Sequence, residues 1–357
     1  MTDHKQKLND LLFMTAKQNA SDLHIAVGRR PTLRIDGILI PLQQEAVLTP
    51  DATEGLVLAL LTPEQKAEFL EKKELDLSFA LEDKARFRVN VFFQRGFMAA
   101  ALRLIPSKIR TIEELGLPPI LHDFTKISQG FVLMVGPAGH GKSTTLAALI
   151  DEINHSRTEH IITVEDPVEY LFFQDKSIIS QREVKSDTPS FHSALKTILR
   201  QDPDVVMIGE MRDPISISTA MTAAETGHLV FSTLHTNSAS QTIDRIIDSF
   251  PASQQGQVMS QLAATLVAIV SERLVPMING GRVPATEIMI VNSAVRNLIR
   301  EKKTYQIDLV IETSVQEGMM TLNRSLSHLV RNKIISLENA EVYSLNPSEL
   351  RLLLERS

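Results

Sequence analysis

The segment from residue 136 to residue 143 limits the possible folds of this chain more than any other part of the sequence. It reads Gly-Pro-Ala-Gly-His-Gly-Lys-Ser and matches the pattern G-x-x-x-x-G-K-[ST] at every fixed position. The apolar residues 131–135 precede it, as expected of a buried strand, and residues 144–150 follow it with the composition of a helix start. A strand, a glycine loop and a helix in this order let backbone N–H groups surround a phosphate chain. We therefore expect a nucleoside triphosphate site.

Two side chains of this loop have distinct expected roles. Lys142 would place its ammonium group on the β- and γ-phosphates, and Ser143 would offer its hydroxyl to Mg²⁺. The surrounding backbone would form the rest of the cradle. The loop residues expected to bind the nucleotide are Gly136, Pro137, Ala138, Gly139, His140, Gly141, Lys142, Ser143 and Thr144.

The composition excludes several classes of protein. The 357 residues include no cysteine, so disulfides, iron–sulfur clusters and cysteine-ligated zinc are excluded. The formal net charge of -6 lacks the basic excess of a general nucleic-acid binder, and we expect no nucleic-acid partner. The first residues do not resemble a signal peptide, and the longest strongly apolar stretch, residues 262–270, is far shorter than a membrane span. We expect a soluble, cytoplasmic protein that reaches a membrane through partners only.

The first part of the chain, residues 1–105, has the pattern of a small α+β domain. Residues 22–26, 31–35 and 86–92 alternate polar and apolar side chains, which predicts half-buried strands. Asp36-Gly37 is a two-residue hairpin signal between two of them. Thr62-Pro63-Glu64-Gln65 predicts a helix start, and we find no catalytic constellation in this part.

The remainder of the chain has a different pattern. Residues 106–119 are punctuated by proline and glycine and indicate a linker. From residue 120 to residue 290 apolar strands alternate with helices, which predicts crossover connections and a parallel sheet. Residues 291–357 are helical and polar. The predicted strands of the sheet are residues 131–135, 160–164, 205–208 and 229–234.

Acidic residues follow two of these strands. Glu210 comes directly after residues 205–208, where an acid can hold Mg²⁺ or its waters. Glu165, Asp166 and Glu169 lie at the end of residues 160–164, and the carboxyl ends of parallel strands form the ligand crevice. One of these three carboxylates is a candidate to orient or deprotonate an attacking water, and sequence chemistry alone does not decide which one.

Two histidines, His228 and His235, flank the last predicted strand. A lone histidine is more often structural than functional, and for each of these two both interpretations stay open at this point. The polar residues that follow the strand suit contact with a γ-phosphate.

Together these motifs resemble the secretion ATPase superfamily, and within it the type IV pilus retraction ATPases. The resemblance covers essentially the whole chain. Besides the phosphate loop, it rests on residues 165–169, on 202–204 with 209–213, on 226–228 with 234–237, on 21–24 and 28–37, on 86–90 with 94–95, and on 294–301. Helical spacing in the last segment predicts that Ala294, Val295, Leu298 and Ile299 pack inward.

The resemblance implies roles for individual residues. Glu169 matches the catalytic glutamate of the family, and Glu210 matches the acid that holds Mg²⁺, here through a water. His228 and His235 match the histidine box, His228 as a nucleotide contact and His235 as a catalytic residue. An arginine of the first domain reaches phosphate in the closed state, and the candidates are Arg86, Arg88 and Arg95.

The resemblance also implies an architecture and an assembly. It implies a PAS-like first domain, a RecA-like ATPase domain with a helical carboxy-terminal part, and a homohexamer with ATP at the domain junction. The implied cofactors are ATP and Mg²⁺. The implied partners are an inner-membrane platform protein of the pilus and, as a further candidate, a paralogous retraction ATPase. The implied location is the inner face of the cytoplasmic membrane.

Two loop residues depart from the family pattern. His140 lies where the family usually has a small hydroxyl residue, and Ala138 lies where it usually has threonine. Because backbone groups form the cradle, we expect ATP binding to tolerate both.

Three other functions compete with pilus retraction, and each conflicts with a feature of the sequence. Pilus extension or secretion ATPases of the same superfamily commonly carry a further amino-terminal domain and a tetracysteine zinc module, which the length and the lack of cysteine disfavour. A non-hydrolysing regulator of another motor conflicts with the intact Lys142, Ser143, Glu169 and Glu210. A RecA-type DNA motor conflicts mildly with the acidic balance.

Overall fold

The computed structural model of the chain describes residues 2–18, 20–35, 37–81, 85–106 and 108–355. The chain forms two compact units. The first unit comprises Met1–Lys108 and Glu169–Leu171, and the second unit comprises Ile109–Val168 and Phe172–Ser357.

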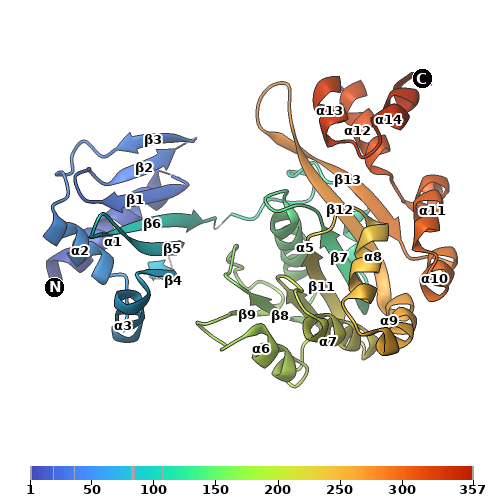
Figure 1. Cartoon of the computed structure of the whole chain (residues 1–357), viewed down its shortest axis with the longest axis horizontal. Coiled ribbons are helices and arrows are strands. Elements are labelled where there is room, and N and C mark those ends of the chain that lie inside the picture. The colour runs from blue at the N-terminus through green and yellow to red at the C-terminus, as the bar shows by residue number, and fades with distance from the viewer. Residues whose placement is uncertain (1, 19, 36, 82–84, 107, 356–357) are drawn as a thin grey trace. The chain divides into compact units, whose positions relative to one another are not determined.

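The first unit is a six-stranded antiparallel sheet with helices on one face (Figure 1). The strand order is β3-β2-β1-β6-β5-β4. Phe87, Val89 and Val91 are fully buried against the helices, and the residues between them point to the opposite face. The elements are α1 (Thr2–Lys17), β1 (Asp22–Ala26), β2 (Thr32–Ile35), β3 (Ile38–Pro41), α2 (Pro50–Leu58), α3 (Pro63–Lys72), β4 (Glu74–Leu81), β5 (Ala85–Gln94) and β6 (Phe97–Ile105).

The structure confirms the strands and the helix start predicted for this unit. Thr62 caps α3 and forms a capping box with Gln65, as its position before Pro63 suggested. At the predicted hairpin Ile35 pairs with Ile38, while Asp36 lies outside the described residues. The sequence reading missed β4 and β6, which complete the sheet on the far side of β1.

The second unit contains a seven-stranded sheet in the order β13-β12-β7-β11-β10-β8-β9. All neighbouring strands are parallel except β13, which is antiparallel to β12. Alternate residues of β7 contribute to two different hydrophobic clusters, so helices cover both faces (Figure 1). The strands are β7 (Gly130–Val135), β8 (His160–Glu165), β9 (Ile178–Glu183), β10 (Val205–Ile208), β11 (Leu229–Leu234), β12 (Leu266–Pro276) and β13 (Arg282–Ile290).

Helices connect these strands and continue to the carboxy-terminal end. The α-helices are α4 (Leu121–Phe124), α5 (Lys142–Ser156), α6 (Phe191–Ile198), α7 (Pro214–Glu225), α8 (Ala239–Asp248), α9 (Ala252–Thr265), α10 (Ser293–Arg300), α11 (Ile307–Thr313), α12 (Leu322–Arg331), α13 (Leu337–Tyr343) and α14 (Pro347–Glu355). Two 3₁₀ turns, Thr304–Gln306 and Val315–Glu317, flank α11.

The predicted α/β class is confirmed: a small PAS-like α+β part precedes a RecA-like part with carboxy-terminal helices. All four strands predicted for the central sheet exist and pair in parallel, as the crossover pattern required. The sequence reading missed β9, β12 and β13. The last two matter most, because β12 lies directly beside β7 and so beside the phosphate loop.

The predicted inward face of α10 is correct at three of four positions. Val295 and Ile299 are fully buried, and Leu298 is half-buried against the same cluster. Ala294 is exposed, so that prediction is wrong. Residues 294 and 298 both lie beside the buried stripe, and only the longer leucine side chain reaches back to the core.

Candidate active site

The phosphate loop joins the end of β7 to the start of α5, and at two of its positions only glycine fits. Gly136 and Gly141 have positive φ angles of 141° and 102°. A Cβ atom on Gly136 would collide with the backbone carbonyl of Glu272, and one on Gly141 would collide with the carboxylate of the same residue. The loop therefore rests on β12, with glycine at both points of close approach.

Lys142, the first residue of α5, has a fixed position beneath the loop. Its side chain is buried, and its ammonium donates to the carbonyl oxygens of Gly136 and Pro137, both at 2.9 Å. Its Nζ also lies 3.3 Å from Nδ1 of His235. The helix start and this ammonium form a positive site whose geometry is set before any anion binds.

His235 joins Lys142 to the strand-end acid Glu210. Its Nε2 lies 3.2 Å from Oε1 of Glu210, while Nδ1 faces Lys142. Arg212 binds the other carboxylate oxygen of Glu210 at 2.8 Å. The strand order explains this chain of contacts, because β11 lies between β7 and β10 and its carboxyl end carries His235. The structure thus brings together three residues that the sequence had placed far apart.

The acids after β8 occupy different environments. Glu165 is buried, and its Oε1 accepts hydrogen bonds from Thr163 at 2.7 Å and from Gln181 at 3.2 Å. Glu169 is exposed and belongs to the short segment that groups with the first unit. A carboxylate that must contact a water and change its proton needs access, which Glu169 has and Glu165 lacks.

The remaining predicted residues lie away from the loop or in the first unit. His228 precedes β11, at the end opposite His235 and roughly 20 Å along the strand. It contacts the carbonyl of Ala223 at 2.9 Å, so the structure does not bring it to the phosphate loop. Arg86 and Arg88 lie on the face of β5 opposite the core, and Arg95 lies in the turn after β5 with a positive φ of 51°.

Sequence reasoning missed Glu272, which lies under the loop. Ser271 pairs with Val135, the last residue of β7, so Glu272 comes level with Gly136. Its Oε2 accepts a hydrogen bond of 2.7 Å from Thr145 in the first turn of α5. Burial raises the pKa of the Glu272 carboxyl to about 7. A single acid inside the apolar run of β12 was the one available signal.

His140 is anchored to the same strand. Its Nδ1 accepts a hydrogen bond of 3.0 Å from the backbone N–H of Leu274, which requires the neutral ring with its proton on Nε2. Burial, together with the positive charge of Arg273, lowers the pKa of His140 and favours that neutral form. This residue, a departure from the family pattern, therefore ties the tip of the loop to β12.

Comparison with known proteins shows the family of this chain. A family model described as Type II/IV secretion system protein matches residues 4–280, and the chain belongs to that family. It is 46% identical to the type IV pilus retraction ATPase PilT of Pseudomonas aeruginosa, over 93% of this chain and 96% of that protein. It is 38% identical to the type IV pilus ATPase PilU of the same organism, over 97% of this chain and 90% of that one.

A solved structure agrees with the fold of the whole chain. The crystal structure of the pilus retraction motor PilT with bound ADP has a TM-score of 0.89 and 45% sequence identity, and the match covers 98% of this chain and 99% of that one. Among the residues that the structure describes, no helix is both long and apolar enough to cross a membrane.

Proposed function

We propose that this chain is an ATPase motor that drives the retraction of type IV pili and so supports twitching motility. The observation that carries the proposal is the contact chain Lys142–His235–Glu210 beside a complete phosphate loop. The high identity to a retraction ATPase over nearly the full length of both proteins supports the same function.

In the proposed reaction, water attacks the γ-phosphorus of ATP, and ADP leaves with phosphate as the second product. Lys142 neutralises the β- and γ-phosphates, and Glu169 accepts the proton of the attacking water. His235 links Glu210 to Lys142, because its Nε2 contacts the Glu210 carboxylate and its Nδ1 contacts the Lys142 ammonium. A change in the contacts of Glu210 is thereby passed on to Lys142. The arginine that stabilises charge on the transferred group comes from Arg86, Arg88 or Arg95.

The donor atoms fit Mg²⁺, which prefers oxygen ligands and keeps several waters. The Ser143 hydroxyl would bind the ion directly, and the Glu210 carboxylate would hold it through a water. When bound, the ion supplies positive charge to the phosphate oxygens. These two residues, which follow β7 and β10, would hold the ion.

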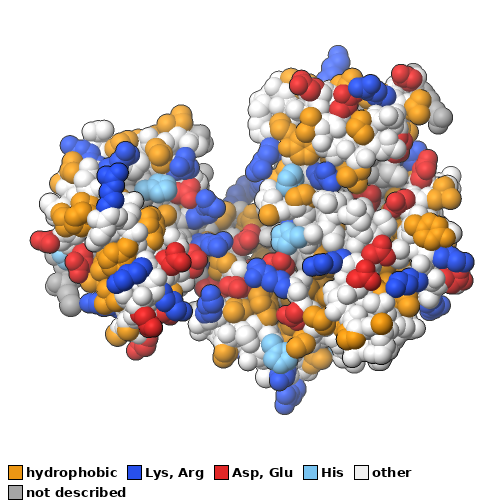
Figure 2. Space-filling view, in the orientation of Figure 1, with side chains coloured by type: hydrophobic (Ala, Val, Ile, Leu, Met, Phe, Trp, Pro, Cys, Tyr) orange, Lys and Arg blue, Asp and Glu red, His pale blue; other side chains and the backbone are white. Residues whose placement is uncertain are grey.

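The proposed working form is a homohexamer in the cytoplasm, at the inner face of the cytoplasmic membrane. It would act on the platform protein of the pilus, with a paralogous ATPase as a further partner. No nucleic-acid partner is proposed, since the net charge is -6. On the face shown in Figure 2, basic and acidic side chains are intermixed over the second unit rather than gathered into one basic patch.

Two experiments test the proposal. Purified chain should release phosphate from ATP in the presence of Mg²⁺; no release would overturn the enzymatic part and favour a non-hydrolysing regulator. A gene deletion should leave cells with excess surface pili and without twitching. Cells that instead lack pili would show that the motor extends them.

A further inference from the structure

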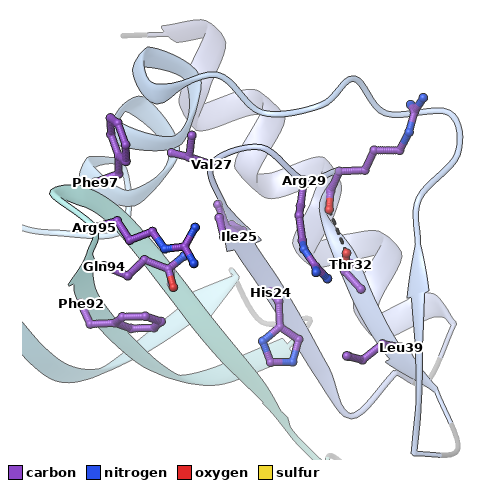
Figure 3. A pocket seen from close by; sticks show the side chains of 13 residues that line it. His24, Ile25, Val27, Arg29, Thr32, Leu39, Phe92, Gln94, Arg95 and Phe97 are labelled. Carbon is purple, nitrogen blue, oxygen red and sulfur yellow. Dashed lines mark hydrogen bonds between the residues drawn. The ribbon is translucent and has the colours of Figure 1, made fainter.

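The first unit contains a cavity on the face of its sheet opposite the hydrophobic core (Figure 3). Its volume is about 650 Å³, within the range of small-molecule sites. His24 alternates with the buried core residues Leu23 and Ile25, and Phe92 follows the buried Val91. The side chains that matter for its chemistry are His24, Arg29, Phe92, Gln94, Arg95 and Phe97.

Two cations of this cavity, Arg29 and Arg95, differ from the other arginines nearby. Among the residues that the structure describes, neither Arg29 nor Arg95 makes a side-chain hydrogen bond or an ion pair. In Figure 3 their side chains extend toward the same space from opposite sides. The neighbouring Arg30 differs, because its guanidinium donates to the backbone carbonyls of Gln43 and Glu45. Arg29 and Arg95 therefore keep their donors available for an anion.

A third polar group lies at the bottom of the cavity. The Nε2 atom of His24 is shielded from solvent and has no hydrogen-bond partner among the described residues. Phe92 and the exposed Phe97 add apolar rings to the lining, on either side of Gln94 and Arg95 in Figure 3.

We propose that this cavity binds a small anionic molecule that carries a flat apolar ring. Its phosphate or carboxylate group would bind the guanidinium groups of Arg29 and Arg95. Its ring would pack against Phe92 and Phe97. The site lies wholly within the first unit, and no part of the phosphate loop contributes to it. It goes beyond the proposed ATPase function through Arg29, His24 and the two phenylalanines, while Arg95 is also one of the three candidates for the catalytic arginine.

The test uses the full chain saturated with ADP, so that the phosphate loop is occupied, and phenyl phosphate as the probe. Calorimetric titration should give saturable binding, and benzoate should distinguish carboxylate from phosphate recognition. Arg29→Ala and Arg95→Ala should each weaken binding about tenfold or more. Arg103→Ala is the control, because Arg103 lies on the same sheet but pairs with Asp22 and does not line the cavity.

Three outcomes would overturn the proposal. These are no saturable binding of either probe, equal weakening in Arg29→Ala and Arg103→Ala, or a change of oligomeric state in Arg29→Ala without probe binding, which would make this face a protein contact. Thermal unfolding of each variant separates these results from misfolding. Arg29 is not among the residues proposed for hydrolysis, so Arg29→Ala should keep full ATP turnover. Failure of the cavity proposal, seen in probe binding, can therefore be told apart from failure of the proposed ATPase function, seen in turnover.

Discussion

Lys142 in the second unit and Arg29 in the first unit are both cations suited to an anion, but the protein holds them differently. The Lys142 ammonium is buried and bonded to two loop carbonyls and to the ring of His235. The Arg29 guanidinium is exposed and has no partner among the described residues. One site is organised by the fold before any ligand arrives, and the other leaves its donors to the ligand.

The difference follows from what supports each cation. Lys142 begins a helix whose first turn is tied to buried Glu272 through Thr145, so the loop cannot shift without breaking a packed layer. Arg29 lies between β1 and β2 and lines the cavity on the sheet face opposite the hydrophobic core of the first unit. A reaction that must stabilise developing charge benefits from the first arrangement, because no reorganisation is needed during the reaction. The second arrangement suits reversible binding.

The largest expected effect is at the organised site. Lys142→Ala should lower phosphate release from ATP about 10²–10³-fold, because it removes a preorganised charge from the phosphates. The fold should persist, since the loop backbone and Glu272 keep their contacts. Phosphate release and thermal unfolding should be measured on the same sample. Lys126→Ala is the control, as Lys126 pairs with Asp123 at the surface. Near-normal turnover in Lys142→Ala would refute the assignment of this loop.

A slightly smaller effect is expected for the proposed base. Glu169→Gln should bind ATP normally and hydrolyse it about 10²-fold more slowly, because the amide cannot accept the proton of the attacking water. Single-turnover kinetics with a separate binding measurement would check this. Glu165→Gln is the matched control and should be milder, since buried Glu165 already accepts hydrogen bonds from Thr163 and Gln181. If Glu165→Gln proves more damaging, the base is Glu165.

The elements of the second unit could be predicted from the sequence, but their order in the sheet could not. The central strands were predictable, because each is a short apolar run followed by helical pattern, and the phosphate loop has fixed spacing. The strand order was not predictable from that pattern. Lys142 and His235 are 93 positions apart, and they meet because β11 lies beside β7 in the sheet. The sequence offers no turn signal between α9 and β12, because the apolar run of residues 262–270 is the end of the helix in its first part and the start of the strand in its second. Periodicity alone therefore did not reveal β12 or the role of Glu272.

The first unit should affect turnover less than the loop does. Arg86→Ala, Arg88→Ala and Arg95→Ala should include at least one variant with turnover lowered about tenfold or more, at nearly unchanged nucleotide affinity. The reason is that an arginine on the transferred group acts in the transition state rather than in binding. Steady-state kinetics with ADP affinity would check the separation, with Arg103→Ala as the control. Wild-type turnover in all three would show that the first unit has no catalytic part.

The smallest expected effect is a pH dependence of stability that comes from Glu272, which lies under the phosphate loop. Burial raises the pKa of Glu272 from about 4.5 to about 7. Between these values the folded chain keeps a proton that the unfolded chain releases, so rising pH favours unfolding, by about 3 kcal/mol across the window. Glu287, whose pKa burial also raises to about 7, adds a similar slope.

Glu272→Gln removes the proton exchange but keeps an oxygen that can accept the hydrogen bond from Thr145. It should therefore make the decline in urea midpoint between pH 5 and pH 8 less steep, and Glu287→Gln should do so by a similar amount. Stability would then be less sensitive to pH, while Arg29→Ala, in the cavity of the first unit, should leave the slope unchanged. If the slope of urea midpoint against pH is unaltered in Glu272→Gln, the Glu272 carboxyl does not titrate in this window. Water would then reach the carboxyl beneath the phosphate loop more than its burial indicates.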